Sequence, residues 1–414
     1  MKKIILLLLA VVLLLSACDS GPAVSPAPSE STDPSDVVVV TEEPDISGDP
    51  QETGDPAPTG GNAVTDDPTH EPLEDPFDDP TPTPRATPKP YDGELVEYKG
   101  DFFHVFFHYL IAYPDIAKTT SYMANLDTDC VTAKEFKAAL QDLYERDFVL
   151  VDITTYVTND VDDDGNPIIK RAPVMVPPGK KPLVMSFDDL SYTTNKLHKG
   201  TIDKIILDAD GNLAAQTIME DGTVDIRYDN EVIPILEAFV SEHPDFSPFG
   251  VKGMLALTGF DGILGYRTHR DSPNRESEIE AVKPIIQALK DAGWTFASHS
   301  YGHIHTDKQT IERVTEDANH WRDEVQPLVG ETPVLVYPFG ESVKNTDPKF
   351  KILMDHGFNI FCGVGMKPFA SWKSNYFFMD RQSIDGYTLR NYADTHLVPL
   401  IDAHDVFDAE AREG

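Results

Sequence analysis

The sequence predicts an α/β protein whose folded part is a (β/α) barrel, distorted or incomplete. Apolar runs of strand length alternate with segments of helical periodicity from about residue 100 onward. The alternating part is about 320 residues long, enough for one large domain, and it shows no internal repeat. Polar residues capable of chemistry follow two of the predicted strands, which is where functional residues lie in a barrel of parallel strands.

The alternation begins with a strand at Val105–Phe107. Thr132 and Glu135 then form a capping box, which predicts the start of a helix. The next strands are Phe148–Ile153 and Pro182–Phe187. The second of them is continuously apolar, which is typical of a strand buried on both faces.

The pattern changes around residues 191–228, where short alternating runs flank the turn Asp208–Asn212. We therefore expect an inserted β-hairpin there. The alternation of helices and strands then resumes, through predicted helices at Val232–Val240, Glu276–Ala292, Ile311–Val325 and Phe350–His356 and strands at Gly253–Leu257, Trp294–Ala297, Val334–Tyr337, Phe358–Gly363 and Tyr376–Asp380.

The N-terminal residues have the composition of an export signal. Two lysines precede the apolar run Ile4–Leu15, which is too short to span a bilayer comfortably. Leu15–Cys18 follows and resembles the bacterial lipobox, which implies a signal peptide at 1–17 and a lipid on the Cys18 sulfur. The alternative is an ordinary signal peptide or an uncleaved anchor. We expect an exported protein on the outer face of the bacterial cell membrane.

Residues 18–90 are predicted to be a disordered tether, and residues 91–414 the catalytic domain. The tether contains about half of the chain's 33 prolines and few apolar residues, so it cannot bury enough surface to offset the entropy lost on ordering. The net charge of -36 makes nucleic acid and anionic lipid surfaces poor partners. Three cysteines give no disulfide framework; Cys130 and Cys362 are either paired or two buried thiols. We expect a monomer.

Two histidines and two aspartates carry the strongest functional signal. Asp188 and Asp189 end a predicted strand, and His299 and His303 follow another. Two imidazoles and one carboxylate form a ligand set for a divalent metal such as zinc, so we expect Asp189, His299 and His303 to bind one ion. Asp188 is then available as a general base.

Two geometric conditions go with this prediction. Consecutive strand residues point to opposite faces, so both aspartates reach one site only if the chain turns there. The spacing of four brings both imidazoles to one side if His303 lies in a first helical turn.

The chain resembles the polysaccharide deacetylases of carbohydrate esterase family 4, which share the NodB homology domain. Ser186–Asp189 is similar to the family's Thr/Ser-Phe-Asp-Asp motif, and His299–His303 to its His-Ser/Thr-x-x-His motif. Tyr337–Gly340 is similar to the Pro-Tyr/Phe-Gly end of its third motif. The resemblance covers about residues 101–392 and implies deacetylation of an acetylated polysaccharide, with the backbone N–H of Phe339 as a donor to the oxyanion.

Two departures from the common pattern resemble the poly-N-acetylglucosamine deacetylase branch. The arginine that orients the catalytic aspartate in the family is replaced by Val336, and Arg381 is our candidate substitute. The alternative for Arg381 is a salt bridge to Asp380 or Asp385. The general acid is expected at His108, before the first motif, with His404 as the competing candidate.

Three further residues complete the candidates. Trp372, in a polar stretch, is expected to stack on a sugar, and Tyr337 to contact substrate. His305 is a minor rival ligand for the metal.

The expected function is hydrolysis of acetamide groups on an N-acetylglucosamine polymer of the cell wall or the extracellular space. The alternatives are an O-acetyl esterase acting on xylan or a similar polymer, and a tethered glycan-binding protein with a degenerate site.

Overall fold

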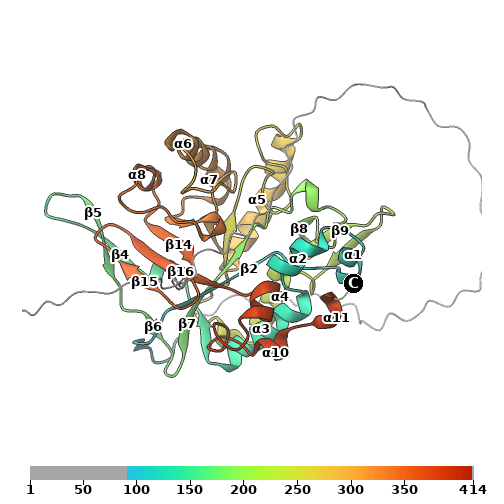
Figure 1. The fold of residues 1–414 in the computed structure, drawn as a ribbon, viewed down its shortest axis with the longest axis horizontal. Coiled ribbons are helices and arrows are strands. Elements are labelled where there is room, and N and C mark those ends of the chain that lie inside the picture. Colours follow the sequence, from blue (N-terminus) through green and yellow to red (C-terminus); the bar gives the residue numbers. More distant parts are fainter. Residues whose placement is uncertain (1–90, 413–414) are drawn as a thin grey trace, which may run out of the picture. The chain divides into compact units, whose positions relative to one another are not determined.

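Seven parallel strands form a closed ring in the computed structural model, which describes residues 91–412. The predicted signal peptide, Cys18 and the 18–90 tether lie outside the described residues. Around the ring the strands are β2 (Phe103–His108), β7 (Lys181–Asp188), β11 (Met254–Leu257), β12 (Thr295–Ser298), β13 (Val334–Val336), β14 (Ile360–Val364) and β16 (Phe377–Ser383). The prediction of a distorted (β/α) barrel is confirmed (Figure 1).

The distortion lies beside β7. One edge of this long strand pairs with β3 (Phe148–Leu150) near its start and with β11 near its end. The two neighbours thus follow each other along one edge of β7, so β3 adds a strand that the ring does not include. A further strand, β15 (Ala370–Trp372), pairs with β16 in the antiparallel direction.

Helices cover the outside of the ring (Figure 1). The capping box of Thr132 and Glu135 is present at the start of α3. Predicted helix 311–325 is interrupted: α6 runs to His320, a π-helical turn covers Trp321–Val325, and a short α7 follows. The helices are α1 (Pro114–Lys118), α2 (Met123–Asp129), α3 (Ala133–Glu145), α4 (Val232–Glu242), α5 (Arg275–Asp291), α6 (Ile311–His320), α7 (Gln326–Val329), α8 (Pro348–Asp355), α9 (Gly386–Asn391), α10 (Ala403–Val406) and α11 (Ala409–Arg412).

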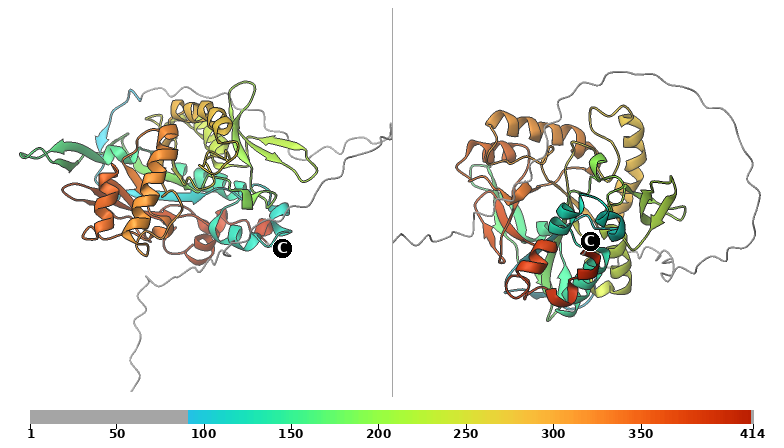
Figure 2. Two further views of the ribbon diagram at one scale, coloured as in Figure 1. Left: turned by 90° about the horizontal axis from the view of Figure 1, so that it is seen from above. Right: turned by 45° about the vertical axis from the view of Figure 1, so that its right-hand side comes forward.

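The insertion predicted at 191–228 has one strand more than a hairpin. β8 (Lys204–Leu207), β9 (Leu213–Ile218) and β10 (Val224–Arg227) form a three-stranded antiparallel sheet. A second hairpin, β4 (Val157–Val161) with β5 (Pro167–Arg171), was not predicted. Figure 2 shows the two antiparallel additions extending away from the barrel on different sides.

The alternation of strand side chains divides the core into two layers. One apolar cluster fills the inside of the ring and includes Val184, Ala256 and Cys362. The other lies between the strands and the helices and includes Met185, Leu255 and Phe361, which are the sequence neighbours of those three residues. Cys130 and Cys362 are both buried free thiols, so the alternative of a disulfide between them is wrong.

Among residues 91–412, no helix combines the length and apolar character needed to cross a bilayer.

Candidate metal site

The end of β7 brings both aspartates to one site. Asp188 is the last residue of the strand and is buried, and its side chain lies on the inner face together with Val184 and Ser186. Asp189 has a φ of 62°, which is unusual for a residue other than glycine. This left-handed residue turns the chain, and the geometric condition for two consecutive aspartates is thereby met.

The loop after β12 presents the two histidines. His299 continues the strand and its Nδ1 lies 3.0 Å from the Val336 carbonyl oxygen, which leaves Nε2 for a ligand. Ser300 and His303 adopt left-handed backbone conformations, with φ of 54° and 50°. The segment is therefore a tight loop, and the expected helical turn is absent; the left-handed residues, and not helical spacing, bring the rings together.

A buried carboxylate stabilises this loop. Asp317 of α6 accepts hydrogen bonds from the backbone N–H groups of Tyr301 and Gly302, both at 2.7 Å. Sequence reasoning missed this residue, because an aspartate inside an amphipathic helix has the pattern of a solvent-facing side chain. Only its burial and its partners reveal that it shapes the histidine loop.

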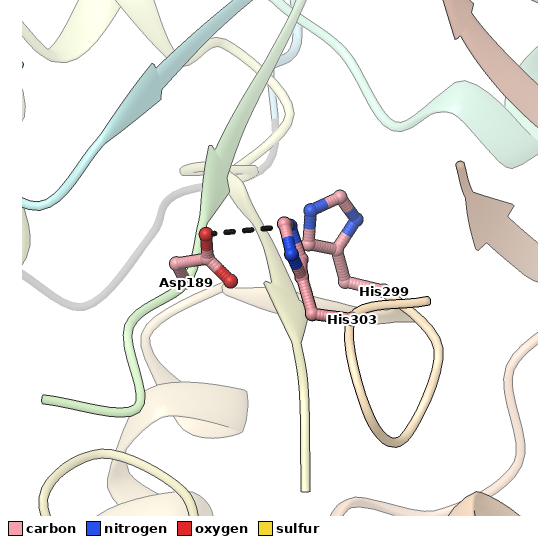
Figure 3. Close-up of side chains that lie close together, drawn as sticks. All are labelled: Asp189, His299 and His303. Atoms are coloured by element: carbon pink, nitrogen blue, oxygen red, sulfur yellow. Dashed lines mark ion pairs between the residues drawn. The ribbon is translucent and has the colours of Figure 1, made fainter. Parts of the chain in front are cut away.

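Asp189, His299 and His303 form a group with metal-ligating geometry (Figure 3). Their ligand atoms all lie within 4.8 Å of one another, and Asp189 Oδ2 is 3.6 Å from His303 Nε2. Two ligands each about 2.1 Å from a tetrahedral zinc lie roughly 3.4 Å apart, so Asp189 and His303 have nearly the required spacing. The group is consistent with a divalent metal site.

The electrostatics of the group favour the ligand forms of the side chains. Burial lowers the pKa of His303 to about 4, which keeps the imidazole neutral. Burial raises the pKa of Asp189, but the nearby His303 and His299 outweigh it and hold that pKa well below its usual range. A neutral imidazole and an ionised carboxylate are the states that bind metals.

Asp188 is held by a buried arginine. Arg381 Nη1 donates to Asp188 Oδ1 at 2.7 Å and to Oδ2 at 2.9 Å, and the guanidinium also lies 4.1 Å from the centre of the Phe106 ring. The alternative partners, Asp380 and Asp385, are not the ones that Arg381 contacts in the described chain. Burial raises the pKa of Asp188, but Arg381, His299 and His108 together lower it, so the carboxylate stays ionised.

His108 lies beside Asp188 at the end of the neighbouring strand, where the two residues pair in the β2–β7 register. Its Nδ1 is 2.8 Å from the Asp129 carbonyl oxygen. Because a carbonyl oxygen only accepts hydrogen bonds, Nδ1 carries a proton there, and Nε2 is the nitrogen left for chemistry. The competitor His404 lies exposed on α10, paired with Asp394. His104, one layer deeper, is buried against the Ser186 hydroxyl.

Phe339 lies on a left-handed turn after β13, with φ of 58°. Its ring is partly exposed, stacks on His305 at 3.8 Å between centroids and meets His303 edge-on. His305 Nδ1 forms a hydrogen bond with Glu341 Oε2 at 2.5 Å, and His305 is not part of the metal-ligating group. The role of the Phe339 N–H as an oxyanion donor stays a prediction.

Two predicted substrate contacts are not at the site. Tyr337 is fully buried in the layer between the strands and the helices, stacked on Phe361, so its ring cannot reach a polymer. Trp372 lies in β15 opposite Phe377, the first residue of β16, and thus at the end of the barrel away from the metal group. Its indole N–H donates to the Tyr156 carbonyl and its ring contacts Arg171, so it is a packing residue and not an exposed loop side chain.

Comparisons with known proteins point to one family. Residues 272–360 match the polysaccharide deacetylase family model, and this segment contains both histidines and the Tyr337–Gly340 turn but not the aspartate pair. No curated protein matches the chain.

Several solved structures are similar at low identity. A Bacillus anthracis protein assigned as a polysaccharide deacetylase is 11% identical over 75% of this chain and 69% of its own, with a TM-score of 0.42. The Streptococcus pyogenes deacetylase PplD, solved with acetate, is 10% identical over 70% of this chain and 94% of its own, with a TM-score of 0.36. A de-N-acetylase from Aggregatibacter actinomycetemcomitans is 13% identical over 69% of this chain and 96% of its own, with a TM-score of 0.39.

The family match covers the segment that supplies two of the three metal-ligating side chains, and the third, Asp189, follows β7 outside that segment. Residues 272–360 are thus similar to the polysaccharide deacetylase family.

Proposed function

We propose that the protein removes acetyl groups from the acetamides of an N-acetylglucosamine-containing polysaccharide outside the cell, in a reaction that depends on one divalent metal, most simply zinc. The observation that carries this proposal is the Asp189, His299 and His303 group beside an ionised, arginine-held Asp188. A ligand group with a separate carboxylate next to it fits hydrolysis better than structural metal binding.

Each side chain has a defined task in this proposal. A bound ion would polarise the acetyl oxygen and activate a water molecule. Asp188 accepts the proton of the attacking water, and Arg381 keeps this carboxylate ionised and oriented. The N–H of Phe339 donates to the oxygen that becomes negative in the transition state.

His108 is the proposed general acid, which gives its Nε2 proton to the departing nitrogen. An amine is a poorer leaving group than an alkoxide, so this proton matters most for amides. His108→Ala should therefore reduce deacetylation of N-acetylglucosamine oligomers by about 10²–10⁴-fold and spare an activated aryl acetate. An equal loss on both substrates contradicts the role, and a selective loss in His404→Ala transfers it to His404.

The decisive experiment is turnover of acetylated chitooligosaccharides by the full chain, before and after chelation and after addition of zinc. We expect release of acetate and free amine that chelation abolishes and zinc restores. Acetate release from acetylated xylan alone would identify an O-acetyl esterase. Binding of the oligomers without any release would identify a glycan-binding protein with a degenerate site.

We also propose that the protein is exported and anchored through a lipid on Cys18, with residues 18–90 as a spacer. The lipobox-like Leu15–Cys18 and the composition of the spacer support this. Cys18→Ser should abolish incorporation of a labelled fatty acid.

A chain reduced to residues 91–414 should be soluble and fully active on short oligomers. An inactive product would show that the spacer has a structural role.

A further inference from the structure

A buried arginine close to the C-terminal end anchors the turn that joins α2 to α3. Arg412 of α11 donates through Nη1 to the Asp127 carbonyl at 2.9 Å and through Nη2 to the Cys130 carbonyl at 2.9 Å. The same guanidinium pairs with Glu135, at 2.8 Å from Nε and 2.6 Å from Nη2. All these donors therefore converge on the segment 127–135, which is more than 270 residues away in the sequence.

This segment contains the acceptor of the His108 ring. The carbonyl of Asp129 accepts from His108 Nδ1, and it lies between the two carbonyls that Arg412 holds. Asp129 ends α2, so its carbonyl belongs to the last turn of a helix, where backbone acceptors have no partner within the helix. The orientation of this carbonyl depends on what fixes the residues on either side of it.

The packing around the segment is tight. The side chains of Arg412 and Glu135 are 3% and 0% exposed, and Asp127 Oδ1 also accepts from Arg412 at 2.9 Å. Gly386, at the start of α9, lies so close that an added Cβ would be 2.0 Å from the Asp127 carbonyl oxygen. Arg390 of the same helix donates to that carbonyl at 2.8 Å from the more exposed side.

Such an arrangement is expensive for stability alone. Removing a guanidinium and a carboxylate from water carries a large desolvation penalty, and a buried pair often stabilises the fold no more than an apolar replacement. What a planar guanidinium supplies is directional: several donors in a rigid fork that fixes its acceptors in one geometry. The acceptors fixed here flank the Asp129 carbonyl oxygen, which accepts from the His108 ring.

We propose that Arg412 is a positioning residue for His108. By fixing the Asp127–Cys130 backbone it aims the Asp129 carbonyl at the Nδ1–H group, so that Nδ1 keeps its proton and Nε2, directed to the site, is the nitrogen that takes up and delivers the proton. This inference rests on the proposed function in one respect, the role of His108 as general acid.

The test uses the full chain and two readouts. We expect Arg412→Ala to lower kcat on N-acetylglucosamine oligomers by about 10- to 100-fold, since a misplacement of about 1 Å can cost 10²-fold, with KM and zinc content unchanged. In the His108→Ala background the same substitution should lower kcat by less than about 2-fold. Arg412→Lys, which keeps the charge and some donors, should restore part of the loss.

The second readout is the tautomer of His108, read from the ¹⁵N shifts of labelled histidine and assigned with His108→Ala. The Nδ1–H form should dominate in the wild-type chain and give way to a mixture in Arg412→Ala. The matched control is Arg146→Ala. It removes a hydrogen bond from the Arg146 Nη1 to the Val398 carbonyl, so it too breaks an arginine contact with the C-terminal part of the chain, but one outside the 127–135 segment. This control should leave kcat and tautomer unchanged.

The outcomes separate this inference from the proposed function. A wild-type tautomer in Arg412→Ala overturns the positioning role, as does an equal loss of kcat with and without His108. If His108→Ala keeps full activity, the general acid is wrong, and the tautomer alone still decides whether Arg412 positions the ring. If Arg412→Ala does not fold, Arg412→Lys and Gly386→Ala, which crowds the Asp127 carbonyl, provide the same two measurements.

Discussion

The two ends of the barrel interior differ in chemistry and in backbone geometry. At the end where the strands begin, aromatic rings close the barrel: Phe102 packs on Tyr156, and Trp372 packs on Phe377. At the end where the strands finish, the inner face holds Asp188. The residues after the strands there include four with left-handed backbones, namely Asp189, Ser300, His303 and Phe339.

This difference shows where the molecule departs from the rules of stable folding. Apolar, regular backbone is the low-energy solution and it fills the starting end. Left-handed residues other than glycine and buried charges each cost free energy. At the finishing end, four such residues and the buried Asp188–Arg381 pair bring ligands and a carboxylate together. The starting end should therefore respond to mutation through stability and the finishing end through chemistry.

The largest effect is expected at the metal-ligating group. A His299→Ala, His303→Ala double variant should lose its divalent metal almost completely and all turnover with it, because one carboxylate is left to bind the ion. Metal content is measured by elemental analysis after dialysis. His305→Ala is the matched control, a histidine in the same loop that should keep full stoichiometry. Unchanged metal in the double variant would refute the assignment.

The next effect concerns the base. Asp188→Asn should keep its metal and lose about 10²–10⁴-fold in kcat, the usual contribution of a positioned general base. Asp380→Asn is the control, since this carboxylate precedes Arg381 in β16 and points to the other face. Loss of metal from Asp188→Asn, whose Oδ2 lies 3.7 Å from His299 Nε2, would mean that the roles of the two aspartates are exchanged.

Asp188 can be compared with a second buried carboxyl, Glu231, which pairs with no cationic side chain among residues 91–412. Glu231 caps α4, is fully buried and accepts from the N–H groups of Val232 and Leu110. Burial raises its pKa to about 8, although hydrogen bonds to Val232, Leu110 and Tyr192 oppose the shift. The folded chain thus keeps a proton that the unfolded chain releases above about pH 4.3, so stability is highest below that pH and falls as pH rises toward 8.

Glu231→Gln should remove this slope. The wild-type unfolding free energy should fall by up to about 1.4 kcal/mol per pH unit between pH 5 and 7 from this group, and the variant should lack that component. Urea unfolding at three pH values measures it. Identical slopes in the two proteins would show that Glu231 is ionised in the fold.

The smallest effect is expected at the starting end. Trp372→Ala should lower the unfolding free energy by about 1–3 kcal/mol, less than for a fully buried tryptophan because the ring is half-buried, and should leave kcat and KM unchanged. Trp372→Phe should recover part of the stability. A raised KM for long oligomers in a stable Trp372→Ala chain would restore the sugar-stacking role that the structure argues against.

Local sequence determined the types of the barrel strands and the helices between them and the position of the chemistry, but it missed the β4–β5 hairpin and the π-helical turn at Trp321–Val325. Alternating periodicity predicted strands and helices, the Thr132–Glu135 box predicted the start of α3, and the end of an apolar strand predicted where Asp188 and Asp189 lie. These features depend on residues within one or two turns of one another, so a local pattern contains them.

Tertiary structure decided which distant residues meet. Arg381 was a candidate to orient the catalytic aspartate, but the sequence left open a salt bridge from it to Asp380 or Asp385. In the structure it contacts Asp188, 193 positions away. Four other features likewise have no local signature: the burial of Tyr337, the place of Trp372 at the other end of the barrel, the absence of a helical turn at His303, and the hydrogen bond that His108 donates to the Asp129 carbonyl. They follow from closing seven strands into a ring, which places side chains by register and not by neighbourhood in the sequence.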